Sequence, residues 1–232
     1  MSLKERIEQV EARIQRACEA SGRKREEVKV VAVTKYVSMA ETAAVLEAGL
    51  DQIGENRIEH AAPKWEALEG RGTWHFIGNL QTKKVKDVIP KFEYIHSLDR
   101  MSLAEELEKR CSAAGFTVKV FVQVNISGEE SKSGLTPEET PEFIRGLASF
   151  HHLQVVGLMT MAPFEAQPED TRPVFRELRE LRDKLNGMKV SREPLTELSM
   201  GMSNDFEIAV QEGATWLRLG SLLVGKGEEE SK

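Results

Sequence analysis

The sequence predicts a single-domain (β/α)8 TIM barrel with an extra N-terminal helix. Short runs rich in β-branched residues alternate with amphipathic helical segments along the whole chain, and eight such strand signals can be counted. No Gly/Ser/Pro-rich linker and no shift of composition divides the 232 residues. These observations favour a closed barrel over an open doubly wound sheet. We therefore expect one domain over residues 1–232, with a helix over 2–22 and a frayed, solvated acidic tail over 226–232.

The N-terminal helix is predicted from apolar residues that recur at steps of four and three, with Ser2 and Glu5 spaced as a capping box and Gly22 as its stop. The next run, Val28–Lys35, is β-branched and uncharged in its middle, which is typical of a strand buried on both faces. The alternation continues with a helix over 38–49, a strand over 52–54, a helix over 58–68, a strand over 73–77, a helix over 84–89 and a strand over 94–98.

The second half of the chain repeats this alternation. Ser102 and Glu105 are spaced to cap a helix, and Val118–Ile126 is the longest strand signal. The segment TPEE at 136–139 combines an N-cap, a proline at the first helical position and a capping-box glutamate, so a helix should run from there to about Ser149. The remaining elements are a strand over 155–160, a helix over 169–185, a strand over 195–200, a short helix from 203 to near 213, and a strand over 216–219.

Composition and charge argue against several classes of protein. The net charge is −6 and the pI is near 5.6, so no general positive charge is available for a nucleic acid backbone. The longest apolar runs are far shorter than the roughly 20 residues that span a bilayer, and the charged N-terminus has no secretory apolar region. Cys18 and Cys111 lie far apart without a CxxC partner, which argues against a disulfide framework and a thiolate zinc site. We expect a cytoplasmic protein that binds neither nucleic acid nor membrane.

Lys35 is the first candidate for chemistry, because it stands at the last position of the first predicted strand. In a barrel the active face is formed by the strand ends and the loops that follow them. Alternation along the strand places Val31, Val33 and Lys35 on one face, so the amine can point into the barrel mouth. The functional interpretation is a Schiff-base lysine that becomes nucleophilic in a desolvated site. The alternative is a lysine that reaches from a strand end to water.

Anion-binding groups follow the seventh predicted strand. The segment LSMGMS at 198–203 offers two hydroxyls, Ser199 and Ser203, together with a glycine and the free N–H groups of a helix N-terminus. Ser203 as an ordinary N-cap of that helix is the alternative interpretation.

The eighth predicted strand carries an inward arginine. Arg218 and Gly220 stand two apart, hence on one strand face, and Ser221 follows directly. A buried unpaired guanidinium is costly, so Arg218 needs a partner, and a structural salt bridge to a neighbouring strand is the alternative to a ligand. Lys35 on the first strand meets these groups on the last strands only if the barrel closes. Their joint occurrence at strand ends is therefore the signal of a site.

A set of short motifs occurs in order along nearly the whole chain. They are VTKYVS at 33–38, IGENR at 53–57, WHFIG at 74–78 with LQ at 80–81, VNISG at 124–128 with SKSG at 131–134, VGLMT at 156–160, LSMGMS at 198–203 and LRLGS at 217–221. In these motifs the sequence resembles the pyridoxal phosphate homeostasis protein family, the YggS/PROSC group, a single-domain relative of the alanine racemase barrel.

The resemblance implies a (β/α)8 barrel that binds pyridoxal phosphate (PLP) as an internal aldimine on Lys35. It implies further roles as follows: Asn56 approaches the cofactor ring, Arg218 faces the pyridine nitrogen, and Ser199, Ser203, Gly220 and Ser221 hold the phosphate. A guanidinium can only donate hydrogen bonds, so a ring nitrogen opposite Arg218 stays unprotonated and the ring becomes a poorer electron sink.

Several residues are assigned no role. Lys83 stands where the family usually has an asparagine, which leaves any role for that loop open. His75 is interpreted as a hydrogen-bonded core or mouth histidine rather than a general base. Glu55 and Arg57 could pair locally instead of touching a ligand. The Gly/Ser-rich loop 127–134 is either a lid or a solvated surface loop.

Two functions remain to be separated. A PLP-dependent amino acid racemase needs a base on each face of the aldimine; Lys35 could serve one, but the two-domain racemases use a tyrosine of a second domain for the other. Here Tyr36 and Tyr94, both in the first half, are the only tyrosines. The resemblance therefore favours a PLP homeostasis protein that buffers or delivers PLP without robust catalysis, as a monomer with PLP-dependent apo-enzymes as candidate recipients. A phosphosugar isomerase would not need Lys35 and Arg218 together.

Overall fold

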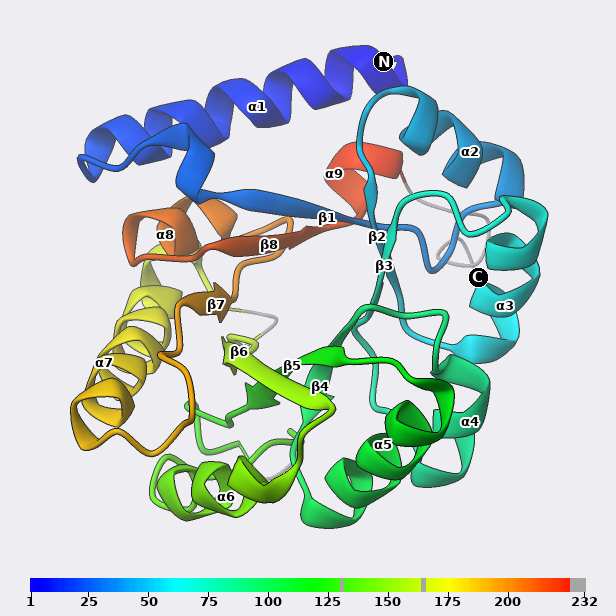
Figure 1. Ribbon diagram of the computed structural model, residues 1–232. Coiled ribbons are helices and arrows are strands. Elements are labelled where there is room, and N and C mark those ends of the chain that lie inside the picture. Colours follow the sequence, from blue (N-terminus) through cyan, green and yellow to red (C-terminus); the bar gives the residue numbers. More distant parts are fainter. Residues whose placement is uncertain (130–131, 164–165, 226–232) are drawn as a thin grey trace.

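A closed barrel of eight parallel strands forms the centre of the protein, as the sequence predicts. The computed structural model describes residues 1–129, 132–163 and 166–225, so the acidic tail expected over 226–232 lies outside the described residues. The strands pair in chain order, and the last pairs with the first (Figure 1). They are β1 (Lys29–Val33), β2 (Gln52–Glu55), β3 (Thr73–Phe76), β4 (Tyr94–Leu98), β5 (Val118–Gln123), β6 (Leu153–Met159), β7 (Glu197–Ser199) and β8 (Trp216–Leu219).

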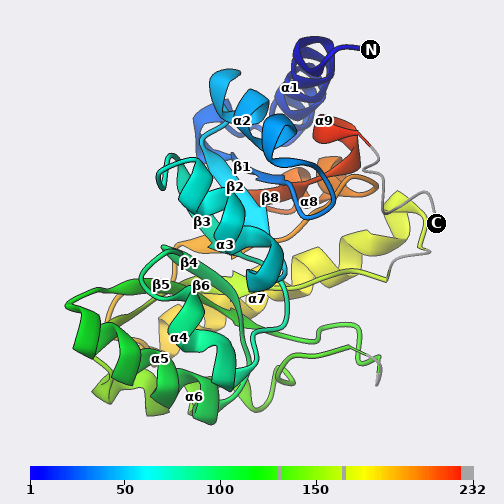
Figure 2. The same ribbon diagram turned by 90° about the vertical axis from the view of Figure 1, so that its right-hand side faces the viewer.

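Helices surround the barrel, and the segments that follow the strands gather at one end of it, on the right-hand side of Figure 2. The helices are α1 (Leu3–Ala20), α2 (Met39–Glu47), α3 (Ile58–Ala67), α4 (Val85–Val88), α5 (Met101–Ala114), α6 (Thr140–Gly146), α7 (Arg172–Met188), α8 (Phe206–Gln211) and α9 (Ser221–Val224). Within the described ranges, no helix is both long enough and apolar enough to cross a membrane.

Closure of the barrel depends on the ladder between β1 and β8. Val31 is paired with Arg218 and Ala32 with Leu219. The first and last strands therefore run side by side, and the segments that leave their C-terminal ends start from the same part of the rim. This ladder is what brings Lys35 near the residues that follow β8.

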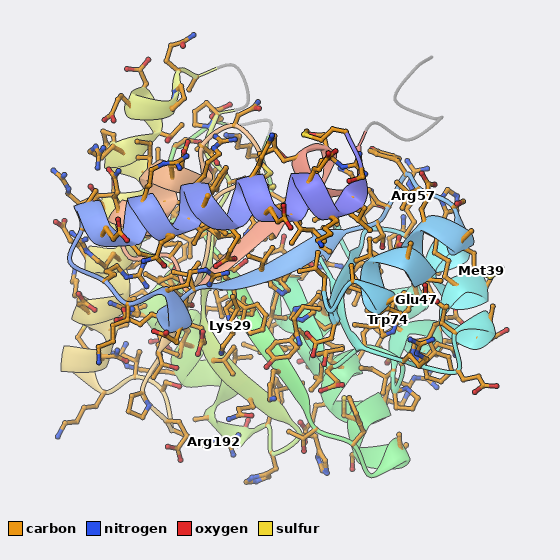
Figure 3. All side chains as sticks on the ribbon, turned by 90° about the horizontal axis from the view of Figure 1, so that it is seen from above. Lys29, Met39, Glu47, Arg57, Trp74 and Arg192 are labelled. Carbon is orange, nitrogen blue, oxygen red and sulfur yellow. The ribbon has the colours of Figure 1, made fainter. Side chains whose placement is uncertain are left out.

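The predicted extra helix α1 covers the outside of this seam. It packs mainly on α8 and α9, and Figure 3 shows it lying across β1, with Lys29 labelled near the start of that strand. Arg6 Nε donates to the carbonyl oxygen of Leu223 at 2.6 Å. Arg13 donates two hydrogen bonds, at 3.0 and 2.8 Å, to the carboxylate of Glu207. The first helix is thus fastened to the last two.

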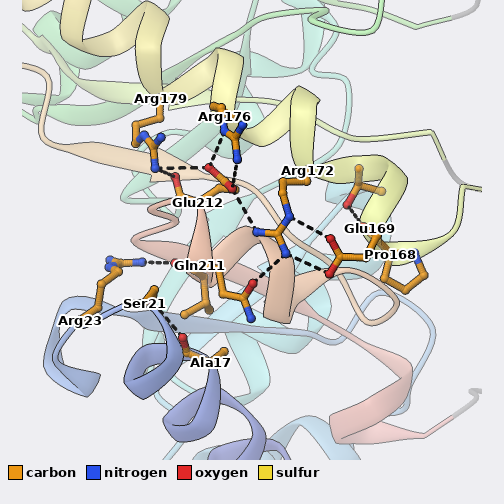
Figure 4. A network of polar contacts seen from close by, with 12 residues as sticks. Ala17, Ser21, Arg23, Pro168, Glu169, Arg172, Arg176, Arg179, Gln211 and Glu212 are labelled. Carbon is orange, nitrogen blue, oxygen red and sulfur yellow. Dashed lines mark hydrogen bonds and ion pairs between the residues drawn. The ribbon is translucent and has the colours of Figure 1, made fainter.

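Helix α7 is joined to α8 by one shared carboxylate (Figure 4). Glu212, at the C-terminal end of α8, lies 3.1 Å from Arg172, 3.0 Å from Arg176 and 3.3 Å from Arg179. Its side chain is almost fully buried, so three cations compensate an acid that water does not reach. The C-terminal end of α8 is thereby held against α7.

Two of the predicted helix starts are confirmed, and each has a capping box. Ser2 with Glu5 and Ser38 with Glu41 make both reciprocal hydrogen bonds at the starts of α1 and α2. In each box the serine side chain and the glutamate side chain satisfy backbone N–H groups that the first helical turn leaves without partners.

Two other starts differ from the prediction. Helix α5 begins after Arg100, not at Ser102, because the Arg100 side chain is held by Asp99 and by the Leu80 carbonyl oxygen just before the helix. Thr136 and Glu139 do exchange the predicted capping bonds, at 2.9 and 3.2 Å. Residues 137–139 nevertheless form only a turn, and α6 starts at 140.

Gly157 in β6 supplies a test of the pairing between β6 and β7. A Cβ at this position would lie 1.8 Å from the carbonyl oxygen of Glu197 in β7, so alanine there must separate the two strands. We expect Gly157→Ala to lower the free energy of unfolding in urea by at least about 3 kcal/mol. Gly187→Ala in α7 is the matched control, because its Cβ would meet no atom within 4 Å, and it should raise stability by up to about 1 kcal/mol. Equal effects of the two substitutions would contradict the β6–β7 pairing.

Candidate functional site

A cavity of about 780 Å³ opens at the C-terminal ends of the strands. Its wall contains six of the seven residues that the sequence analysis proposed for the site: Lys35, Asn56, Ser203, Arg218, Gly220 and Ser221. Ser199 does not line it. A second cavity of about 470 Å³ lies at the other end of the barrel, under α1, and is lined by none of the seven. The C-terminal cavity is therefore the candidate site.

Lys35 lies in the turn between β1 and α2, two residues beyond the end of the strand. The prediction that the strand extends to Lys35 is therefore wrong, because the chain turns at Thr34, whose carbonyl oxygen accepts from the Val37 amide at 3.2 Å. The side chain is half-buried, and its Nζ lies 4.6 Å from the centre of the Tyr36 ring. The amine still reaches the cavity, now from a turn instead of a strand.

A buried ion pair holds the turn that contains Lys35. Glu55 Oε1 lies 2.8 Å from Lys64 Nζ and accepts a hydrogen bond of 2.7 Å from Thr34 Oγ1. Lys64 Nζ also donates to the Thr34 carbonyl oxygen at 2.7 Å. Glu55 thus pairs with Lys64 and not with Arg57, and the pair fixes the peptide group that directly precedes Lys35. Sequence reasoning missed Lys64, although its spacing on the buried stripe of α3 was a usable signal.

Asn56 follows β2, and its position depends on a glycine in the next strand segment. A Cβ at Gly78, just after β3, would lie 2.3 Å from the Asn56 carbonyl oxygen. Only a glycine permits this approach of the two segments. Both residues line the cavity.

The segment that follows β7 also contributes to the wall of the cavity. The Asp205 carboxylate accepts from the Met202 amide at 2.6 Å, and this turn moves the start of α8 to Phe206. The alternative interpretation of Ser203 as the N-cap of the helix is therefore wrong, since Asp205 occupies the cap position. Ser203 instead lines the cavity from within the turn. Burial raises the pKa of Asp205, against the effect of its bond from Met202.

Gly220 and Ser221 continue the rim beyond β8. Gly220 precedes the short helix α9, and its carbonyl oxygen accepts from the Leu223 and Val224 amides at 2.8 and 2.9 Å. A Cβ on Gly220 would lie 3.6 Å from Val33, which shows how near the two strand ends come to each other.

Arg218 is the buried cation of the cavity. Its side chain donates to Ser199 Oγ at 2.5 Å and to the Thr160 carbonyl oxygen at 2.9 Å. Burial lowers its pKa to about 10, and the nearby Asp205 charge opposes that effect. Within the described part of the chain no ion pair joins Arg218 to a carboxylate, so a structural salt bridge is not its partner. A guanidinium has five N–H donors, so this one has donors to spare at the cavity.

Ser199 stands behind Arg218, fully buried between that guanidinium and His96. Its Oγ lies 2.8 Å from His96 Nδ1. His96 was not found by sequence analysis, because a single histidine in a strand gives no periodic signal. His75, which was interpreted as a hydrogen-bonded core or mouth histidine, is a buried core residue 2.9 Å from His96.

Part of the loop 127–134 contributes to the cavity wall, although residues 130 and 131 lie outside the described residues. Lys132 lines the cavity and is paired with Glu129 at 2.6 Å. Ser133 also lines it, and its carbonyl oxygen accepts from Gln123 at 3.0 Å. Lys83 is exposed and is not among the lining residues.

Comparison with known proteins identifies the family of this chain. The family model of the alanine racemase N-terminal domain matches residues 6–227. A pyridoxal phosphate homeostasis protein of Aquifex aeolicus is 44% identical over 227 residues, which are 97% of this chain and 99% of the relative. A protein of the same name from Pseudomonas aeruginosa is 37% identical and covers 97% and 95% of the two chains. The chain belongs to the pyridoxal phosphate homeostasis protein family.

Solved structures extend the comparison to the fold of this family member. PipY of Synechococcus elongatus, solved with PLP bound, has 32% sequence identity and a TM-score of 0.81 over 92% of this chain and 100% of PipY. A D-threonine aldolase of Filomicrobium marinum has a TM-score of 0.71 with 14% identity over 92% of this chain, so that likeness is of the fold alone.

The ion pair below Lys35 gives a stability prediction. Lys64→Met leaves the Glu55 carboxylate buried without its cation, and we expect a loss of about 3–5 kcal/mol in urea unfolding. The double variant Glu55→Gln/Lys64→Met should recover most of it. Lys84→Met is the control, because Lys84 pairs with Glu59 at the surface and should cost no more than about 1 kcal/mol. A loss at Lys64 as small as at Lys84 would disprove the structural role of the pair.

The two buried imidazoles predict acid sensitivity. Burial lowers the pKa of His75 from 6.5 to about 3. Between these values the unfolded chain binds a proton that the folded chain does not, so the free energy of unfolding falls as pH drops below 6.5 toward 3. His75→Gln should flatten this dependence, measured by urea unfolding across that range. An unchanged slope in the variant would contradict a neutral, buried His75.

Proposed function

We propose that this protein binds PLP and serves PLP homeostasis, buffering or delivering the cofactor without robust catalysis of its own. One observation carries the proposal: Lys35 after the first strand and Arg218, Gly220 and Ser221 on and after the last strand line a single cavity. Its volume of about 780 Å³ lies within the usual range for a small-molecule site.

The residues present fit PLP. When bound, PLP supplies an aldehyde that condenses with a primary amine and releases water. Lys35 provides that amine. Ser203 and the backbone N–H groups at Gly220 and Ser221 receive the phosphate, each by a charge-assisted bond of roughly 1.5–3 kcal/mol. Asn56 lines the same cavity and would contact the ring of the bound cofactor.

Arg218 determines what the site can do chemically. With a pKa of about 10 it carries its proton at neutral pH, and it can only donate. A ring nitrogen that accepts from it receives a hydrogen bond and no proton, which disfavours carbanion chemistry. Ser199 acts through Arg218 in this proposal, since it contacts the guanidinium and not the cavity.

The alternative, an amino acid racemase, needs a second base opposite Lys35. Tyr36 lies beside the Lys35 amine, with its ring centre 4.6 Å from Nζ. Tyr94 lines the cavity at the other end of the barrel and stacks on His75 at 4.4 Å. Neither tyrosine is placed to serve the opposite face of a ligand on Lys35, which supports a carrier.

The same reasoning extends to location and partners. Cys18 and Cys111 are buried and unpaired, in keeping with a reducing compartment, so we place the protein in the cytoplasm. We further propose that it acts as a monomer and that PLP-dependent apo-enzymes receive its cofactor.

Replacement of Lys35 tests the function directly. Lys35→Ala should abolish the visible absorption band of lysine-bound PLP and leave the unfolding curve unchanged, because the core does not use this amine. Lys132→Ala, which removes another lysine of the cavity wall, should keep the band. Borohydride reduction followed by peptide mass analysis should place the cofactor on residue 35. A band that survives in Lys35→Ala, or a label on another lysine, overturns the assignment.

Replacement of Ser203 tests the phosphate end. Ser203→Ala should weaken PLP binding roughly tenfold and leave pyridoxal binding nearly unchanged, because only PLP carries the phosphate. Ser133→Ala removes a hydroxyl elsewhere on the cavity wall and should affect neither ligand. Equal losses of both ligands in Ser203→Ala would remove the phosphate from this turn. Titrations followed by absorbance provide the measurement.

A further inference from the structure

A line of hydrogen bonds crosses the interior of the barrel from Arg218 to Gln52. Arg218 contacts Ser199 Oγ at 2.5 Å, and Ser199 Oγ lies 2.8 Å from His96 Nδ1. His96 Nε2 lies 2.9 Å from His75 Nδ1, and His75 Nε2 lies 2.9 Å from Gln52 Oε1. The three middle side chains are fully buried. The line therefore joins the PLP-side cavity to the cavity at the opposite end, which Gln52 lines.

The direction of every bond follows from the arginine. A guanidinium can only donate, so Ser199 Oγ accepts from Arg218. His96 Nδ1 is the other hydrogen-bond partner of this buried hydroxyl among the described residues, so its single proton points there, since a proton turned elsewhere would be buried without an acceptor. His96 then carries its proton on Nε2 and donates to His75 Nδ1. By the same reasoning His75 carries its proton on Nε2 and donates to Gln52 Oε1.

The far end favours the same direction. Gln52 Nε2 donates to Asp51 Oδ1 at 2.9 Å, so the amide oxygen of Gln52 is the atom that faces His75. The opposite amide orientation would turn that oxygen toward the Asp51 carboxylate, where two acceptors repel each other. Both ends thus favour donors that point from Arg218 toward Asp51, and the two preferences add along the chain.

The electrostatics of the interior agree with this order. Burial lowers the pKa of His75 to about 3, and burial, with the His75 and Arg218 charges, holds the pKa of His96 well below its usual range. Each ring is therefore neutral at pH 7, with one donor and one acceptor nitrogen, which is what a continuous chain needs.

We propose that Ser199, His96 and His75 are positioning residues: they hold Arg218 toward the cavity through a hydrogen-bond chain of one fixed direction that ends at Asp51. The chain offers a lone pair to the buried cation at one end and an N–H group to the carboxylate at the other, so it stabilises both charges. Neighbouring bonds in such a chain polarise one another, so a change at Gln52 reaches Arg218. Only the identity of the group that Arg218 faces rests on the proposed function.

The tautomers of the two histidines test the chain without PLP. In ¹⁵N-histidine NMR spectra of the PLP-free protein between pH 6 and pH 8, we expect both His75 and His96 to carry their proton on Nε2, with Nδ1 unprotonated. A proton on Nδ1 of either ring, or a charged ring in this range, overturns the proposal. This outcome does not depend on whether the protein binds PLP.

Substitution of Ser199 tests whether the bonds act together. Ser199→Ala should produce mixed tautomers at His96 and also at His75, which Ser199 does not contact, and Ser199→Thr should restore the single tautomer at both. Tyr94→Phe is the control, because its ring stacks on His75 at 4.4 Å while its hydroxyl lies outside the chain. An effect of Ser199→Ala confined to His96 overturns a continuous chain.

Substitution of Gln52 tests transmission to the PLP cavity. Gln52→Met removes the last acceptor, and we expect the dissociation constant for PLP to rise about threefold to tenfold. Gln154→Met, an exposed glutamine of β6, should leave it unchanged. Wild-type affinity in Gln52→Met overturns the coupling. If the wild-type protein forms no lysine-bound PLP, the proposed function fails, and the tautomer spectra still decide the chain.

Discussion

The pairing of β1 with β8 is the constraint on which the site depends. Lys35 follows the first strand and Gly220 follows the last. The two residues are far apart in the sequence, so contacts between sequence neighbours do not bring them together. The register that sets Val31 opposite Arg218 closes the sheet and brings both segments to one part of the rim. Lys35, Gly220 and Ser221, three of the groups proposed to bind PLP, are brought together by this closure.

The interior of this barrel is polar where an ordinary barrel core is filled by branched apolar side chains. Arg218, Ser199, His96 and His75 occupy it, and the two imidazoles stack on aromatic rings, His75 on Tyr94 and His96 on Phe121, each with centroids 4.4 Å apart. Such a core is tolerable because each polar group finds a partner from another strand. The buried ion pair between Glu55 of β2 and Lys64 of α3 likewise supports the turn that contains Lys35.

The sequence predicts what depends on local pattern. Alternation of strand and helix signals predicts the barrel, because β-branched runs and capping boxes act within a few residues of the chain. The bounds of β8 are also as predicted. The start of α8 was misplaced because Asp205, not Ser203, closes the preceding turn, and both residues have capping side chains.

The contrast between local patterns and contacts distant in sequence also explains which residues of the candidate site could be predicted. Six of the seven residues were found because their motifs lie at strand ends, where a barrel gathers them. His96 and Lys64 were missed because their partners come from other strands or helices. The spacing of Lys64 on the buried stripe of α3 signals its burial, but no spacing along the chain identifies its partner. The position of Ser199 behind Arg218 likewise depends on the neighbouring strand and not on its own motif.

The attachment of α1 to α8 and α9 has a consequence for how the chain folds. Helix α1 packs mainly against α8 and α9, so most of the native partners of its apolar face are synthesised long after it. Contacts this distant in sequence slow folding, because a long loop must close before they form. During synthesis the apolar stripe of α1 therefore lacks these partners until α8 and α9 have been made, which leaves it open to a chaperone in that interval.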